Sequence, residues 1–465
     1  MFLDEECILK VLLIQPPFNP EYNLPPLALG TLASAVDAAG HEVKILDFNL
    51  KFKDGIPIKS AVYKSLKYDA DVVGLTCWGN MSPFVIEFCK MFKSIQPETK
   101  LVIGGEYATF RSEDILRKSK ADFVVRGEGE ETFIKLLDTL EHNGKISKLQ
   151  GITYRKGDKI ISLPDNPHFL DMDKLPFINW NLFEDLKKYD GYGKYGQIPI
   201  QASRGCPFNC IFCSVQRTWG GIQRRKSPAR LIAEIKHLIE NFDVMWLGFV
   251  DDTFTLNKKW VIKICNLMLK EKIDLRWKVI TRIDLVDEDL LSIMKKSGCV
   301  EIFYGVESVV PEIQRFIGSK SYAENLVKKN IAKTIAAGIE PVISVIFGWP
   351  IDTLKTVKHM ARFCEDVVKR GVSRIHMHML FPLPGTRLVK EYSSAIIPNP
   401  YPKVTQPDLA KIPYELYSLL ELHREYVPDF WMFKSKYIDP LKLIRIYAET
   451  KLSIIEANIH RYSFA

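Results

Sequence analysis

Short apolar runs alternate with amphipathic helical segments in two successive series along this chain of 465 residues, and this pattern constrains its fold most. In the first series, helical patterns fall at residues 27–39, 82–94 and 112–118. The strand-like runs between them are 10–14, 43–47, 71–76, 100–104 and 123–126. Because strands that alternate with helices form parallel sheets, residues 1–150 are predicted to be an α/β domain with a doubly wound parallel sheet.

The second series begins at residue 196 and predicts another parallel sheet. Its strand-like runs are 198–202, 244–250, 276–281, 299–305, 341–347 and 374–380. The helix expected at 228–241 can be capped by Ser227, and Pro228 suits its first position. Six strand–helix units are fewer than a closed barrel needs, so residues 196–395 are predicted to form a partial (β/α)6 barrel of the TIM type. Residues 151–195 are predicted to be a linker, and residues 396–465 a helical C-terminal segment.

Three cysteines follow the first strand of the second series. Cys206, Cys210 and Cys213 are separated by three and then two residues. Thiolates are soft donors that bind zinc or iron–sulfur clusters. Zinc sites usually include a fourth Cys or His, but there is no second paired motif and the nearest histidine, His237, lies 24 residues beyond Cys213. The spacing therefore favours a 4Fe–4S cluster with one open iron over zinc or a structural accident.

Polar and glycine-rich groups also stand at the ends of later strands in this series. Asp251 and Asp252 could bond a ribose or ammonium group, or cap the next helix. The forked side chain of Arg282 suits a carboxylate ligand, or a salt bridge to Asp284. The other strand-end segments are 304–308, 348–350 and 382–386.

The first series has its own strand-end segments, and parallel sheets bind ligands at the carboxyl ends of their strands. Glycines at such ends let a bulky ligand approach the backbone. Cys77 could contact such a ligand, although a free buried cysteine is the ordinary alternative. The segments are Pro16-Pro17, Thr76-Cys77-Trp78, Gly104-Gly105 and Arg126-Gly127-Glu128-Gly129.

The cysteine run, with Phe212 before its last cysteine, resembles the signature of the radical S-adenosylmethionine (SAM) superfamily. Over residues 8–390, the strand-end motifs resemble in their order the subclass with an N-terminal, Rossmann-like cobalamin-binding domain. The resemblance implies three cofactors, namely cobalamin, SAM and a 4Fe–4S cluster held by Cys206, Cys210 and Cys213. In this family SAM chelates the open iron, and its reductive cleavage gives a 5′-deoxyadenosyl radical.

The same resemblance implies which residues contact the cofactors. The SAM contacts expected from it are Phe212, Asp251, Arg282, Glu307, Gly348 and Pro350. Phe212 would stack near the adenine, with packing beneath the loop as the alternative. The cobalamin contacts expected from it are Pro17, Leu27, Thr76, Cys77, Trp78, Gly104, Gly105, Glu106, Arg126, Gly127, Glu128 and Gly129.

The chain departs from its relatives at one of these segments. Many relatives read Gly-Gly-Pro-His-Ala-Thr where this chain has Glu106 and Tyr107 after the two glycines, and these bulkier residues could reshape or block the corrin site. The Asp-x-His-x-x-Gly sequence that gives a histidine to cobalt in cobalamin mutases is absent. His41 precedes a strand and is interpreted as a turn residue.

The resemblance implies a class B radical SAM methyltransferase, which transfers a methyl group from SAM through methylcobalamin to an unactivated carbon. An enzyme of the same architecture that catalyses cyclisation, carbon–carbon coupling or oxidation is the alternative, and a non-catalytic cobalamin or redox sensor is an alternative of another class. The substrate is left open between a peptide, a lipid and a small natural product. An electron donor such as flavodoxin or ferredoxin is expected.

Composition and charge limit the partners and the cellular compartment that can be expected for this chain. A net charge of +8 does not demand nucleic acid as a partner, and none is expected. No run approaches the ~20 apolar residues of a membrane span. Acidic residues 4–6 do not fit a signal peptide, and nine scattered cysteines do not form a disulfide framework. A reducing cytoplasm is therefore expected.

Two further features have no fixed interpretation from sequence. His376 and His378 alternate on the sixth strand and so share one face, either in an active cavity or among polar core groups. Residues 430–437 interleave aromatic side chains with lysines, which predicts either contact with a membrane surface or, preferably, docking onto the barrel.

Overall fold

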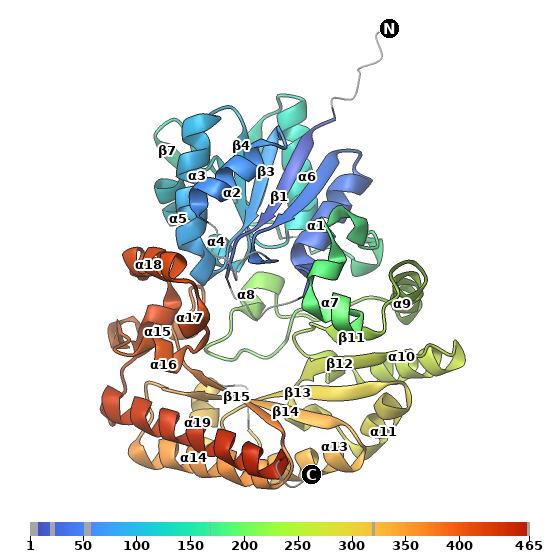
Figure 1. Cartoon of the computed structure of the whole chain (residues 1–465), viewed down its shortest axis with the longest axis vertical. Helices are drawn as coiled ribbons and strands as arrows, with labels where there is room; N and C mark the ends of the chain where they lie inside the picture. The colour runs from blue at the N-terminus through green and yellow to red at the C-terminus, as the bar shows by residue number, and fades with distance from the viewer. Residues whose placement is uncertain (1–7, 19–23, 51–56, 168, 319–320, 463–465) are drawn as a thin grey trace. The chain divides into compact units, whose positions relative to one another are not determined.

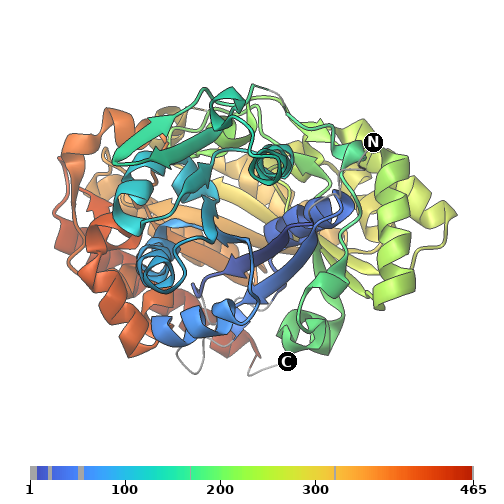
Figure 2. The same ribbon diagram turned by 90° about the horizontal axis from the view of Figure 1, so that it is seen from above.

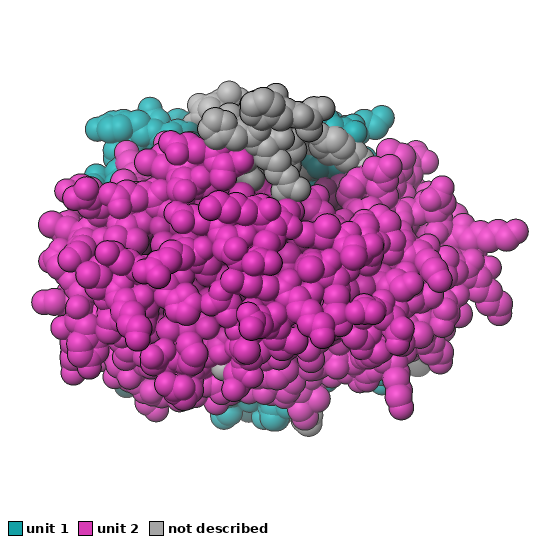
Figure 3. Space-filling view, turned by 90° about the horizontal axis from the view of Figure 1, so that it is seen from below, with its two compact units in different colours: residues 1–194, 411–427 teal, residues 195–410, 428–465 magenta. Residues whose placement is uncertain are grey.

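The structure is a computed structural model that describes residues 8–18, 24–50, 57–167, 169–318 and 321–462. Acidic residues 4–6 and Cys7 lie outside the described residues. The chain divides into two compact units (Figure 1). The first is Met1–Lys194 with Lys411–Val427, and the second is Tyr195–Ala410 with Pro428–Ala465, coloured teal and magenta in Figure 3.

The first unit is built on a seven-stranded sheet among its described residues, with strand order β2-β1-β3-β4-β5-β6-β7. The strands are β1 (Lys10–Gln15), β2 (Glu42–Asp47), β3 (Val72–Thr76), β4 (Lys100–Gly104), β5 (Phe123–Val125), β6 (Ile152–Lys156) and β7 (Lys159–Ser162). β1 to β5 pair in parallel, whereas β6 and β7 are antiparallel additions. These two strands fall in the range predicted as a linker, so the sheet continues to Ser162.

Helices cover both faces of this sheet (Figure 2). α1 (Leu27–Ala38) packs with α6 (Gly129–Glu141), while α3 (Ser82–Ile95) packs with α2 (Ile58–Leu66) and α5 (Ser112–Ser119). Because both faces are buried, the parallel strands are almost continuously apolar, as in the buried β1 segment Val11–Ile14. The doubly wound α/β prediction is confirmed.

The second unit contains a six-stranded parallel sheet whose described strands follow chain order, β8-β11-β12-β13-β14-β15. The strands are β8 (Gln197–Ile200), β11 (Trp246–Phe249), β12 (Arg276–Thr281), β13 (Cys299–Glu307), β14 (Glu340–Phe347) and β15 (Arg374–Met379). The helices between them are α9 (Pro228–Phe242), α10 (Lys258–Lys270), α11 (Glu288–Lys296), α13 (Glu324–Ala336) and α14 (Leu354–Lys369). β8 and β15 remain separate edges of the sheet, so the predicted open partial barrel is confirmed.

One of these helices shows how local sequence fixes an element boundary. The Ser227 side chain accepts a hydrogen bond from the backbone N–H of Arg230, and Pro228 occupies the first helical position of α9. Leu231, Ile235 and Leu238 then form its buried stripe. The start of this helix was therefore readable from sequence.

The C-terminal region is mainly helical, as expected, and contains one short hairpin. Its elements are β16 (Ile396–Pro398), α16 (Pro402–Thr405), α17 (Asp408–Lys411), α18 (Tyr414–Leu422), β17 (Trp431–Phe433) and α19 (Pro440–Tyr462). Phe430, Met432 and Phe433 are buried, so this part of the segment docks onto its own unit, whereas Tyr437 is 65% exposed. No helix in the described ranges is both long and apolar enough to cross a membrane. The predicted domain limits stay predictions.

Candidate active site

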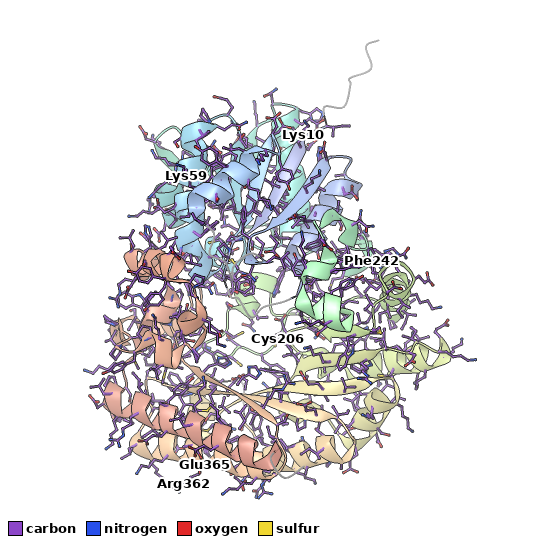
Figure 4. The ribbon with its side chains drawn as sticks, viewed as in Figure 1. Lys10, Lys59, Cys206, Phe242, Arg362 and Glu365 are labelled. Carbon is purple, nitrogen blue, oxygen red and sulfur yellow. The ribbon has the colours of Figure 1, made fainter. Side chains whose placement is uncertain are left out.

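The three cysteines lie on one loop of the second unit, between β9 (Ser203–Arg204) and α8 (Val215–Trp219) (Figure 4). None of the three forms a disulfide, and all three residues are partly exposed. Among the residues described, no three His, Cys, Asp or Glu side chains gather around a single metal position. A cubane takes each thiolate on a different iron, so its ligands need not converge on one point. Three soft donors on one accessible loop fit such a cluster.

Two acidic side chains after β11 fix the start of this loop. The backbone N–H of Gly205 donates to Asp252 over 2.9 Å. Asp251 accepts from the N–H of Ala202 over 3.2 Å and from the Ser203 hydroxyl. Asp251 is fully buried, and burial raises its pKa to about 7. Asp251 therefore anchors the loop from a buried position, and its expected contact with SAM stays a prediction.

Close backbone packing holds the same loop elsewhere. Gly205 has φ +93°, and a Cβ there would lie 2.4 Å from the carbonyl oxygen of Ile222, so only glycine fits. Between the second and third cysteines, Ile211 donates to the carbonyl of Ile317 over 3.0 Å and accepts from the N–H of Leu388 over 2.8 Å. These contacts fix the path of the loop without using the thiols.

The thiols themselves differ in their surroundings. Burial, assisted by the nearby Cys210 and Cys206, raises the pKa of Cys213 to about 12. The Cys206 sulfur lies 3.4 Å from the hydroxyl oxygen of Thr253. Cysteines bind iron as thiolates, so loading the site would release protons.

Arg282, after β12, uses its guanidinium within the protein. Its Nε and Nη2 donate to the two carboxylate oxygens of Asp284 over 3.0 and 2.8 Å. The guanidinium carbon also lies 3.8 Å from the ring centre of Phe208 in the cysteine loop. The structure thus contains the salt bridge that was the alternative to a SAM carboxylate contact.

Glu307 ends β13 in a strained conformation. Its φ of +60° is uncommon for any residue except glycine, and the pairing with β14 is interrupted between Gly305 and Glu307. Its carboxylate accepts a hydrogen bond from the Ser344 hydroxyl over 3.2 Å. Backbone strain of this kind concentrates at functional sites. The strain and the bulge support the expectation that Glu307 faces a ligand.

The Gly348-Trp349-Pro350 turn after β14 is organised by an acid that the sequence analysis overlooked. One oxygen of Asp352 accepts the N–H groups of Gly348 and Trp349 over 3.0 and 2.9 Å. Burial raises the pKa of Asp352 to about 6. Gly348 and Pro350 are buried beside Trp349 in the described conformation. The sequence shows an acid two residues after Pro350, but its bonds to the turn depend on how the chain folds back.

Phe212 connects this turn to the cysteine loop. Its ring meets that of Trp349 edge-on, with centroids 5.5 Å apart. Trp349 is buried, whereas Phe212 is partly exposed. The packing alternative is therefore present, and the exposed part of Phe212 leaves the adenine contact as a proposal.

In the first unit, the strand-end turns carry glycines and one exposed indole. Trp78 is 53% exposed after β3, and its ring centroid lies 5.8 Å from that of Phe18. Gly105 has φ +96°, and a Cβ there would be 2.9 Å from backbone atoms of Cys77. Gly127 has φ +74°, but its Cβ position is open. An open glycine turn and an exposed flat side chain on one sheet edge fit a large planar ligand such as a corrin.

Two of the expected cobalamin contacts, Cys77 and Pro17, are buried in the protein. Cys77 is fully buried, and desolvation raises its pKa well above the ordinary value, so its thiol cannot touch a corrin in this conformation. Pro17 is likewise buried. Tyr107 is also buried among core side chains, so it does not block the edge, and of the two departing residues only Glu106 stays partly exposed.

Two charged residues at the end of β5 are engaged by the chain itself. The Arg126 guanidinium bonds the Thr153 hydroxyl, the Leu163 carbonyl and the Asp165 carboxylate. Glu128 accepts the N–H of Leu170 over 3.0 Å. Both residues therefore fasten β6, β7 and the following chain, which makes direct side-chain contact with cobalamin a weaker expectation than the sequence suggested.

The remaining expected residues keep part of their surface accessible. His41 precedes β2 and so lies at the amino end of a parallel strand, away from the strand-end turns, as the turn interpretation requires. The partly exposed positions are Leu27, Thr76, Gly104, Gly105, Gly127 and Gly129.

The two histidines of β15 share one face, as predicted. Their rings are stacked at 6.3 Å, and Phe303 of β13 meets His376 edge-on at 5.2 Å. Both rings are accessible to solvent, yet surrounding protein partly desolvates them and lowers their pKa values. The lowered pKa favours the uncharged imidazole of each histidine.

Comparison with known proteins agrees with this organisation. A model of the B12 binding domain matches residues 18–137, and a model of the Radical SAM superfamily matches residues 200–364. The uncharacterized methyltransferase PH0819 of Pyrococcus horikoshii is 33% identical over 393 residues, which cover 82% of each protein. The anaerobic magnesium-protoporphyrin IX monomethyl ester cyclase of Synechocystis is 30% identical over 64% of this chain and 61% of its own length.

A solved structure shares the fold over nearly the whole chain. The radical SAM methyltransferase TsrM of Kitasatospora setae, with cobalamin and a 4Fe–4S cluster bound, superposes with a TM-score of 0.74 at 16% identity, covering 97% of this chain and 89% of TsrM. These matches agree with the predicted enzyme class, because they find a B12 binding domain and a Radical SAM domain in one chain and the fold of TsrM over nearly its whole length. The chain belongs to the radical SAM superfamily, in the group that carries an N-terminal B12-binding domain.

Proposed function

We propose that this enzyme transfers a methyl group from SAM to an unactivated carbon of an organic substrate. The observation that carries the proposal is the combination, in one chain, of a three-thiol loop on an open parallel barrel with a B12-binding fold. When bound, the cluster supplies the electron that cleaves SAM, and cobalamin supplies the carrier for the methyl group. The substrate class stays open between peptides, lipids and small natural products.

In the second unit, the chain's contribution is to hold three sulfurs and one SAM molecule. Cys206, Cys210 and Cys213 are the proposed ligands, on a loop whose start is fixed by buried Asp251. Glu307 is the proposed polar contact to SAM, because its strained backbone directs a carboxylate from the strand end. A preformed loop lowers the ordering cost of binding.

In the second unit, the adenine side of SAM is assigned to the turn after β14 and to the cysteine loop. Asp352 holds both N–H groups of the Gly348–Trp349 peptide in place, and Trp349 supports the ring of Phe212 from its edge. The partly exposed Phe212 then offers an aromatic surface to the adenine. Arg282 is proposed to position the loop through Phe208 and not to bind SAM directly.

In the first unit, cobalamin is proposed to occupy the strand-end edge. The backbone turns at Gly104-Gly105 and Gly127 would let the ligand approach closely, and Trp78 would cover a flat face of the corrin. No histidine is proposed as a cobalt ligand, because His41 stands at the opposite end of its strand. The chain would therefore hold the corrin by shape and apolar contact.

The test is anaerobic reconstitution with iron, sulfide and cobalamin, followed by mass analysis of the products of SAM. Methylation should consume two SAM molecules and yield S-adenosylhomocysteine beside 5′-deoxyadenosine. Cys210→Ser should lose 5′-deoxyadenosine formation and keep bound corrin. Deoxyadenosine without S-adenosylhomocysteine would contradict methyl transfer and point to ring formation or another radical reaction, as the name of the Synechocystis relative describes for that protein.

The proposal also includes an electron source and a compartment. Cleavage of SAM needs one electron, which a flavodoxin or a ferredoxin would supply. Thiolate ligands on a partly exposed loop stay reduced in the cytoplasm, where we place the enzyme.

A further inference from the structure

The cysteine loop lies inside a long stretch of chain that carries only positive charge. No Asp or Glu occurs between residues 191 and 233. The basic residues of the stretch are Lys194, Arg204, Arg217, Arg224, Arg225, Lys226 and Arg230. Lys226 is buried against Glu234 and Arg204 is also buried, so neither contributes strongly to the surface. Lys194 and Arg217 are exposed, and Arg224, Arg225 and Arg230 are partly exposed; of these residues, Arg217, Arg224 and Arg225 lie nearest to the cysteine loop in sequence.

Strand pairing places two of these arginines beside the first cysteine. β10 (Arg224–Arg225) runs antiparallel to β9, with Arg224 opposite Arg204 and Arg225 opposite Ser203. The cysteine loop begins directly after β9. The turn that precedes β10 also touches the loop, because the Ile222 carbonyl oxygen lies only 2.4 Å from where a Cβ on Gly205 would be.

Helix α8 also lies beside the cysteine loop. The Gln216 side chain donates to the carbonyl of Pro207 over 3.2 Å, so this helix also borders the cysteine loop. Pro207 and Asn209 are exposed between the cysteines. Ile222 is 77% exposed in the middle of the arginines. Arginine is enriched at protein interfaces, and the exposed side chain of Ile222 would add apolar contact area close to the arginines in sequence.

We propose that this basic turn, defined as Arg217, Ile222, Arg224 and Arg225, is the docking surface for a small acidic electron-carrier protein. Positive charge beside the loop attracts an acidic partner and orients it during encounter. The inference rests on the proposed function, since only a redox-active loop requires such a partner. The carrier would supply the one electron that reductive cleavage of SAM requires, and Cys206, Cys210 and Cys213 would hold the cluster that receives it; cleavage of the C5′–S bond would then give methionine and a 5′-deoxyadenosyl radical.

The test measures SAM cleavage by the reconstituted full chain with two electron sources. One source is an acidic flavodoxin kept reduced by its reductase, and the other is a photoreduced deazaflavin, which needs no protein docking. The double variant Arg224→Glu/Arg225→Glu should cleave SAM at least about tenfold more slowly with flavodoxin. It should keep the wild-type rate with deazaflavin and the wild-type iron content.

A matched charge change on α10 provides the control. Lys263→Glu/Lys270→Glu alters net charge by the same amount at two exposed positions of that helix. This variant should keep the flavodoxin-driven rate. Ile222→Ala should weaken flavodoxin saturation without changing the deazaflavin rate, because it removes contact area and no charge.

Salt dependence of the wild-type enzyme tests the surface without any variant. Raising ionic strength from about 0.05 to 0.3 M should slow flavodoxin-driven cleavage and leave deazaflavin-driven cleavage unchanged. An unchanged flavodoxin rate in Arg224→Glu/Arg225→Glu would overturn the docking surface. The docking surface would also be overturned if Arg224→Glu/Arg225→Glu lost binding to RNA or to anionic vesicles and still kept the flavodoxin-driven rate. Failure of the wild-type enzyme with deazaflavin would instead overturn the proposed function.

Discussion

The strand-end turns of the two units are built on different principles. In the second unit, buried acids hold the turns: Asp251 binds the start of the cysteine loop, and Asp352 binds the N–H groups after β14. In the first unit, the turn at Gly127 is open, and the charged neighbour Arg126 bonds the added strands. The charged residues Asp251, Asp352 and Arg126 at these strand ends therefore support the chain through hydrogen bonds within it.

The difference suits what each unit is proposed to hold. A cluster needs sulfurs at fixed positions, and a loop tied at both ends provides them. A corrin is broad, so an edge with little side-chain bulk and one exposed Trp78 can accept it. Rigidity is thus expected to matter most in the cysteine loop, and open space in the first unit.

Two glycines with similar backbone angles give the largest expected contrast. Gly205 has φ +93° and a carbonyl oxygen 2.4 Å from its Cβ position, whereas Gly127 has φ +74° and nothing within 4 Å. Gly205→Ala should displace the cysteine loop at a cost of about 3 kcal/mol or more and abolish iron binding. Gly127→Ala should cost about 1 kcal/mol, keep iron, and weaken cobalamin binding. Iron analysis and thermal unfolding check both, and equal iron contents would contradict the contrast.

Buried carboxyls in the two units should shape the dependence of stability on pH. Burial raises the pKa of Asp352 and of Asp47 from 3.8 to about 6. Between pH 4 and 6 the folded protein keeps a proton that the unfolded chain releases, so stability falls as pH rises through this window. Across this window each group lowers the free energy of unfolding by up to about 3 kcal/mol. Above pH 6 neither group lowers it further.

Variants separate the two contributions. Asp352→Asn and Asp47→Asn should each make the decline between pH 4 and 6 shallower, in the second and first unit respectively. The measurement is the melting temperature of each calorimetric transition across that range. Asp158→Asn, at an exposed position, is the control and should leave the slope unchanged. A slope unaffected by either buried-site variant would show that these carboxyls titrate normally.

The architecture was predictable because it depends on local periodicity. Apolar runs buried on both faces and the helices between them fix parallel sheets with little help from tertiary contacts, as Val11–Ile14 illustrates. β6 and β7 were not recognised as part of the sheet, since joining it depends on pairing with β5. Lys411–Val427 belongs with the first unit through contacts such as α18 with α3, which are distant in sequence.

The site shows the same division between local and tertiary information. The spacing of Cys206 to Cys213 is local, so the loop was found from sequence. Whether Asp251 or Cys77 faces a ligand depends on burial, and both turned inward. Asp352 was missed because its function appears only when the chain folds back on the N–H groups of Gly348 and Trp349.

A smaller effect is expected on SAM binding in the second unit, where Glu307 is the proposed contact. Glu307→Gln keeps the shape of the side chain but removes its charge, so a charge-assisted hydrogen bond to SAM would be lost at a cost of about 2 kcal/mol. SAM affinity measured on cluster-loaded protein should fall about thirtyfold. Glu301→Gln, on the same strand and in a salt bridge with Arg374, is the control and should keep the affinity. Unchanged affinity in Glu307→Gln would remove this residue from the proposed SAM site.

The smallest expected effect concerns Trp78 in the first unit. Because its side chain is 53% exposed, Trp78→Ala should leave the melting temperature nearly unchanged. Loss of an aromatic surface against the corrin should weaken cobalamin binding about tenfold, or about 1.4 kcal/mol, and Trp78→Phe should recover part of it. Equilibrium dialysis against cobalamin gives the affinity, and iron content reports the second unit independently. If Trp78→Ala binds cobalamin as tightly as the native chain, the open edge holds its ligand through the glycine turns alone, and the contrast between the units rests on backbone geometry.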